Sequence, residues 1–111
     1  MGKSYVEYLP FDNSVKQQLH VLIQLILDCK IDCSRIVLFG SYARVEQTAH
    51  SDLDILVLTS NEIPREVRGS LCSKFDELNA DLIFYQEDIF KNSDKLLVKL
   101  IKREGVLLWK S

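Results

Sequence analysis

The 111-residue chain lacks a long apolar run, an excess of basic charge and any internal repeat. Its longest apolar stretch, Leu19 to Leu27, contains His20 and Gln24 and is far too short to span a bilayer. A formal net charge of -2 argues against a general nucleic-acid binder, because such proteins are usually basic. Hydrophobic residues make up 47% and charged residues 27%, as in ordinary globular proteins. We therefore expect a single domain over residues 1–111, in which residues 1–13 form an N-terminal arm.

The chain also lacks the cysteines that a disulfide framework would need. Its three cysteines, Cys29, Cys33 and Cys72, are odd in number, and no apolar segment of signal length is found near the N-terminus. The spacing of Cys29 and Cys33 could begin a zinc site, but His20 and His50 complete no metal-ligand spacing. These features favour free thiols and a cytoplasmic location.

Two common phosphate-binding signatures are absent, namely Gly-x-Gly-x-x-Gly and Gly-Lys-Ser/Thr. The sequence instead holds Gly40-Ser41, ten further residues, and then Asp52-Leu53-Asp54. From average residue usage, this spacing arises by chance in on the order of one in a thousand chains of this size. We therefore treat it as the main functional signal of the chain.

Apolar periodicity and capping residues predict an α/β fold, with a small mixed β-sheet and helices packed mainly on one face. The gap from Phe39 to Asp52 is too short for a crossover helix with its loops, so the first two strands are expected to pair antiparallel. Strands are expected over residues 35–39, 52–58, 80–85 and 106–109. Helices are expected over residues 15–29, 41–44, about 64–79, 87–91 and 95–104.

Three aspartates lie at the starts of predicted strands. Asp52 and Asp54 are two residues apart, so both carboxylates leave the same face of their strand. Adjacent like charges are costly, and Mg²⁺ relieves the conflict with the hard oxygen ligands that it prefers. If the next strand is a neighbour, Asp81 reaches the same pocket, and three carboxylates would bind one or two metal ions or accept a proton from an attacking hydroxyl. The alternative is that Asp52 and Asp81 are only turn residues at strand entries and that Asp54 is merely exposed.

A glycine turn ends the first strand of the predicted sheet. Gly40 lets the chain turn sharply, and the following backbone N–H groups and the Ser41 hydroxyl can then hold an anion. A metal site beside an anion cradle points to a nucleoside triphosphate.

The two segments Gly40-Ser41-Tyr42-Ala43-Arg44 and Ser51-Asp52-Leu53-Asp54 resemble the minimal nucleotidyltransferases of the polymerase-β-like superfamily. The resemblance extends from about the first helix to Trp109. It implies that fold, a triphosphate held by Gly40 and Ser41, and Mg²⁺ bound by Asp52 and Asp54. It further implies that Asp81 is the third carboxylate, which helps to activate the acceptor hydroxyl, and that Arg44 contacts phosphate or the acceptor.

The same resemblance implies a reaction in which a hydroxyl attacks the α-phosphorus of ATP and pyrophosphate leaves. Minimal proteins of this kind are often paired with a HEPN-domain ribonuclease toxin, and the antitoxin transfers AMP to a tyrosine of that partner. We adopt this as the expected function, without membrane or sequence-specific nucleic-acid binding, and leave the oligomeric state open. A non-catalytic toxin-binding module and an aminoglycoside-type small-molecule enzyme are the alternatives, although larger enzymes of the superfamily carry a helical domain that is missing here.

Three further features yield expectations. Similar proteins often have glycine where this chain has Val45, and a β-branched residue tolerates positive φ poorly, so the loop after Arg44 is expected to differ. Leu56 and Leu58 share the strand face of the paired aspartates, and we expect the last helix to cover them. Basic side chains also fall on one side of that helix, where a solvated face is favoured over contact with an acidic partner or RNA. These are Lys95, Lys99, Lys102 and Arg103.

Overall fold

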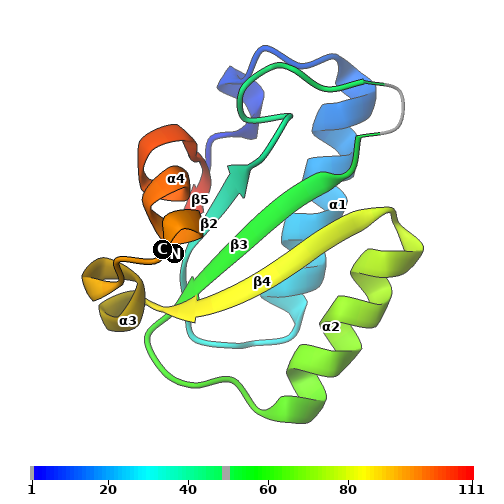
Figure 1. Cartoon of the computed structure of the whole chain (residues 1–111). Coiled ribbons are helices and arrows are strands. Elements are labelled where there is room, and N and C mark those ends of the chain that lie inside the picture. Colours follow the sequence, from blue (N-terminus) through cyan, green and yellow to red (C-terminus); the bar gives the residue numbers. More distant parts are fainter. Residues whose placement is uncertain (1, 49–50) are drawn as a thin grey trace.

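The computed structural model describes residues 2–48 and 51–111 (Figure 1). Within these residues, five strands form one mixed sheet in the order β1-β5-β2-β3-β4. The strands are β1 (Lys3–Ser4), β2 (Cys33–Phe39), β3 (Leu53–Thr59), β4 (Ala80–Gln86) and β5 (Val106–Lys110). The helices are the 3₁₀ turn η1 (Val6–Tyr8), α1 (Asn13–Asp28), α2 (Arg65–Glu77), α3 (Glu87–Asn92) and α4 (Leu96–Glu104).

Strand pairing follows from the lengths of the connections. β2 and β3 pair antiparallel, as the short gap between them predicts. β3 and β4 pair parallel because α2 supplies the crossover between them. β1 pairs antiparallel with β5, which places Lys3 opposite Lys110.

The two longer helices, α1 and α2, pack on one face of the sheet, and the shorter α3 and α4 lie on the other. The α1 side buries Leu19, Ile26 and Phe75 against β2 and β3. On the other side, Leu56 and Leu58 are fully buried with Val98 and Ile101 of α4, so the expected cover of that strand face is confirmed. None of the helices in the described residues has the length and apolar character that a membrane crossing requires.

Some local predictions were wrong. The segment after Gly40 forms consecutive turns and no helix, and the predicted loop 45–51 includes residues 49 and 50, which lie outside the described residues. Leu78, which the periodicity assigns to the buried side of its helix, is exposed because α2 ends at Glu77.

The N-terminal arm is anchored, since Val6 is fully buried and the Tyr5 N–H donates to the Leu108 carbonyl at 2.8 Å.

Candidate active site

A left-handed glycine closes the end of β2. Gly40 has a φ of 78°, which glycine adopts without steric cost. A Cβ atom at this position would collide with the Asp54 carboxylate, coming within 3.0 Å of Cγ. Phe39 pairs directly with Asp54 across the β2–β3 ladder. The sequence therefore needs glycine here for two reasons, the backbone angle and the close approach of the turn to a carboxylate.

Asp54 and Asp81 meet at the beginnings of two parallel strands. They occupy the same register position of the neighbouring strands β3 and β4, so their side chains leave the sheet next to each other. Desolvation, followed by the negative charge of Asp81, raises the pKa of Asp54 from 3.8 to about 6, and Asp52 adds a smaller effect in the same direction. The structure thus brings Asp54 and Asp81 together as the sequence predicts, with Asp52 exposed two residues away.

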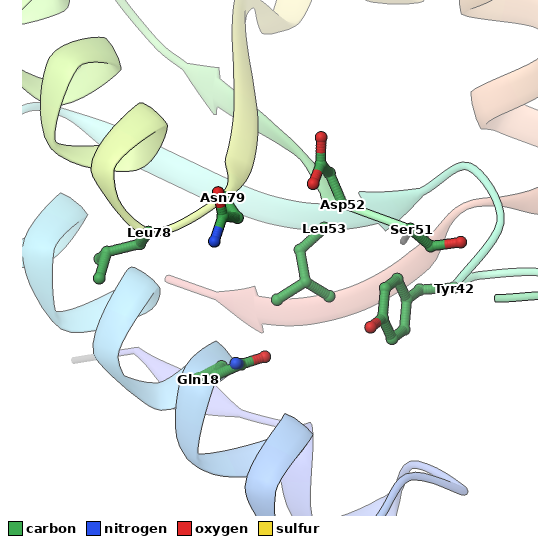
Figure 2. Close-up of a pocket in the computed structure, with 7 residues that line it drawn as sticks. All are labelled: Gln18, Tyr42, Ser51, Asp52, Leu53, Leu78 and Asn79. Atoms are coloured by element: carbon green, nitrogen blue, oxygen red, sulfur yellow. The ribbon is translucent and has the colours of Figure 1, made fainter. Parts of the chain in front are cut away.

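A cavity of about 380 Å³ lies beside Asp52, at the same end of the sheet. Figure 2 shows the Leu53 side chain directed towards Gln18 of α1, whereas the Asp52 carboxylate points to the other side of the strand. The cavity therefore lies mainly on the α1 side of β3, and Asp52 is the one of the three predicted aspartates that lines it. Its polar lining was not predicted, because Gln18, Tyr42 and Asn79 come from three distant segments that share no local motif.

The donor set at the carboxylates fits a divalent cation that is completed by its substrate. Within the part of the chain that the structure describes, no three His, Cys, Asp or Glu side chains are grouped so that they could hold a metal ion by themselves. Mg²⁺ in nucleotide sites is usually bound by one or two carboxylates, with water and phosphate oxygens supplying the other ligands. Asp54 and Asp81 lie side by side on β3 and β4, and the negative charge of Asp81 helps to raise the pKa of Asp54, so this pair meets that requirement.

Arg44 lies in the turn beyond Gly40 and pairs with two glutamates. Its Nε donates to Glu46 Oε1 at 3.0 Å, and its Nη1 donates to Glu104 Oε2 of α4 at 3.3 Å. The hydrogen bond to Glu104 is the main reason that the pKa of Arg44 is raised above its ordinary value. The positive charge of Arg44 offsets a small part of the rise in the pKa of Asp54. Arg44 is thus near the carboxylates, but it would have to exchange a glutamate for phosphate to contact a nucleotide.

The turn keeps a left-handed residue despite the valine. Val45 has a φ of 55°, a left-handed backbone conformation that is unfavourable for a β-branched residue. The Val45 N–H donates to the Tyr42 carbonyl at 3.1 Å, and the Glu46 N–H donates to the Ser41 carbonyl at 2.8 Å. These bonds hold the turn in place at the cost of local strain.

The three thiols are free, as predicted. Burial raises the pKa of Cys33 to about 12, which makes this thiol unreactive at neutral pH. Cys29 and Cys33 belong to no metal-binding group within the described residues.

Comparison with protein families finds one described as "Polymerase beta, Nucleotidyltransferase", which matches residues 22–111. The chain belongs to this nucleotidyltransferase family. A comparison with curated proteins finds no significant match.

Several solved structures are similar to this chain in fold. A toxin–antitoxin complex with AMP-PNP is 26% identical, with a TM-score of 0.65, and the match covers 84% of this chain and 73% of that chain. The complex of the MNT antitoxin with the tri-AMPylated HEPN toxin of Shewanella oneidensis is 24% identical, with a TM-score of 0.61, and the match covers 86% of this chain and 72% of that chain. A putative nucleotidyltransferase of Sulfolobus solfataricus is similar at 22% identity, TM-score 0.53 and 92% coverage of both chains. The last two likenesses concern the fold alone.

Proposed function

We propose that this nucleotidyltransferase moves AMP from ATP to a protein hydroxyl, a tyrosine of a HEPN-domain toxin, and thereby acts as an antitoxin. The observation that carries the proposal is the close approach of the Gly40 turn to Asp54, which shares a register position with Asp81 of the neighbouring strand. A phosphate-binding turn and a carboxylate pair therefore meet at the end of one sheet. The pair of toxin and antitoxin in the 26% identical complex with AMP-PNP supports the choice of ATP and of a protein acceptor.

The residues of the site have distinct roles in this proposal. The backbone N–H groups after Gly40 and the Ser41 hydroxyl hold the triphosphate, because consecutive N–H groups in a tight turn form an anion cradle. Asp52, Asp54 and Asp81 would hold one or two Mg²⁺ ions, which neutralise the charge that builds on the phosphate oxygens. Asp81 accepts the proton of the attacking hydroxyl, the new P–O bond forms at the α-phosphorus, and pyrophosphate leaves. Arg44 contacts phosphate or the acceptor once it leaves Glu46 or Glu104.

The proposal is tested with α-labelled ATP, Mg²⁺ and a purified HEPN-domain toxin as the acceptor. Wild type should transfer label to one or more tyrosines, and Asp54→Asn should lose at least a hundredfold in rate while it stays folded. If the HEPN-domain protein stays unlabelled, but wild type and Asp54→Asn bind and neutralise it equally well, the chain is a non-catalytic binding module. Label on an aminoglycoside, with none on the protein, would assign it to the small-molecule enzymes.

A further inference from the structure

The outer side of α4 carries an exposed apolar patch. Among the described residues, Leu96 is the most exposed large hydrophobic side chain, at 85%, and Leu97 is 43% exposed. Together with Leu100 they line a shallow hollow of about 400 Å³, which we call the α4 leucine patch. The opposite side of the helix is occupied, because Val98 and Ile101 are buried against the sheet. The patch is therefore not needed for the packing of α4 on its own domain.

A row of positive charge borders the patch. Lys95, Lys99 and Arg103 are each four residues apart and exposed, so they form one stripe beside the leucines. Lys102 is directed elsewhere, because its Nζ donates to the Lys91 carbonyl at 2.9 Å. The patch with its basic border is complementary to a surface that is apolar at its centre and acidic at its edge.

The patch leads towards the candidate active site. Leu96, Leu100 and Glu104 follow one another at intervals of four residues, so they form a single row along the helix. Glu104 contacts Arg44 at 3.3 Å, and the charge of Arg44 acts on Asp54. One helical turn, roughly 6 Å along the axis, separates Leu100 from Glu104. A protein that lies on the patch would therefore have side chains within reach of the carboxylates.

We propose that the protein acceptor docks on the α4 leucine patch through an apolar surface bordered by acidic residues. The inference rests on the proposed function, since it assigns a place on this chain to the acceptor of that reaction. A second copy of the chain fits less well, because a symmetric contact would bring the basic row of one copy against the same row of the other. A lipid bilayer is also a weaker candidate, because three leucines on a nine-residue helix offer little apolar area.

The test uses two variants on α4 and two matched controls elsewhere. Leu96→Glu/Leu100→Glu removes the apolar surface, and Lys95→Glu/Lys99→Glu/Arg103→Glu reverses the basic border. Val21→Glu on α1, where the side chain is 46% exposed, and Lys74→Glu on α2 are the controls on the opposite face. Each variant is assayed for label transfer to the HEPN-domain protein and for binding of that protein in the absence of ATP.

Both α4 variants should raise KM and Kd for the HEPN-domain protein by about tenfold or more, because central interface residues dominate binding. KM for ATP should stay within about twofold of wild type, and the controls should behave as wild type. Transfer and binding by both α4 variants equal to wild type would overturn the docking proposal while the proposed function stands.

Absence of transfer by wild type would instead reject the proposed function, and the ATP-independent binding assay would still decide on docking. Self-association that is lost in Leu96→Glu/Leu100→Glu, with partner binding unchanged, would assign the patch to a second copy and overturn the proposal. Loss of binding to anionic vesicles, again with partner binding unchanged, would assign it to a membrane with the same result.

Discussion

Replacing Asp54 by asparagine should stabilise the metal-free protein at neutral pH. The substitution keeps the size of the side chain and removes a charge that the site disfavours. The pKa of Asp54 is raised from 3.8 to about 6, first by desolvation and then by Asp81. At 1.36 kcal/mol per pH unit, ionising this group costs the folded state roughly 3 kcal/mol at pH 7.5. Because Asp54 is partly solvated, we expect a gain of about 1–2 kcal/mol in the free energy of unfolding.

The sign of the pH dependence follows from the direction of the shift. Between the pKa of the unfolded chain and that of the folded protein, the folded state binds more protons, so this contribution to stability falls as the pH rises from about 4 to 6. Asp54→Asn cannot titrate and lacks this slope. The difference between the variant and wild type should therefore be largest above pH 6 and shrink towards pH 4.

Urea unfolding in EDTA between pH 4 and pH 8 measures the effect, and Asp52→Asn is the matched control. Asp52 is exposed, so its substitution should change stability by less than about 0.5 kcal/mol. Added Mg²⁺ should then stabilise wild type by about 1.4 kcal/mol at ten times its Kd and leave Asp54→Asn unchanged. A variant that is no more stable than wild type at pH 7.5, with a constant difference at lower pH, would refute the account of this carboxylate pair.

Three other substitutions test the turn after Gly40 and the ion pair between Arg35 and Glu87. Gly40→Ala should lose about 1–3 kcal/mol of stability and most of its transfer activity, because the new Cβ collides with Asp54 and the backbone has a positive φ. The control Gly69→Ala lies in open space on α2 and should gain about 0.5–1 kcal/mol in the same urea assay. Val45→Gly should gain about 1 kcal/mol of stability, because glycine adopts the left-handed conformation of this residue without strain. The control Val21→Gly in α1 should lose about 1 kcal/mol of stability. The same change in stability for both variants in thermal unfolding would show that Val45 is not strained. Glu87→Gln should cost about 1 kcal/mol at pH 7, because Glu87 accepts bonds from Arg35 Nε at 2.9 Å, Arg35 Nη2 at 2.8 Å and Ser34 Oγ at 2.5 Å. The hydrogen bond from Arg35 lowers the pKa of Glu87, so the stability that Glu87 contributes is present above the unfolded pKa and is lost as the pH falls through the folded pKa. The loss of stability in Glu87→Gln should therefore vanish in acid. A loss that persists in acid, or an equal loss in the exposed control Glu77→Gln, would count against the pairing.

The sequence predicted the parts of the site that depend on neighbouring residues. Strand alternation places Asp54 beside Leu56 on one face, and a short connection forces β2 and β3 to pair antiparallel. The proximity of Asp81 required one more assumption, that β4 lies next to β3, and the parallel register satisfies it. Such features are fixed by chain geometry over a few residues, so local patterns suffice to predict them.

The remaining features depend on contacts between distant segments. The partner of Arg44 on α4, Glu104, is sixty positions away, and no periodicity links the two residues. The cavity beside Asp52 draws Gln18 and Asn79 from elements that the sequence treats as ordinary helix surface and loop. Residues 41–44 are compatible with a helix in sequence, but the structure has consecutive turns there, followed directly by the left-handed Val45. Local patterns hold no information on such pairings.

The pairing of Lys3 with Lys110 bears on how the protein can be engineered. Lys110 also lies opposite Arg35, near the start of β2, whereas Phe39 at the end of that strand reaches Asp54. Lys3 and Lys110 therefore lie together at one end of β2, roughly 13 Å along this strand from Phe39, at about 3.3 Å per strand residue. A short glycine–serine linker would join the chain at these two residues, and a circular permutant opened between β3 and α2 would retain every residue of the candidate site.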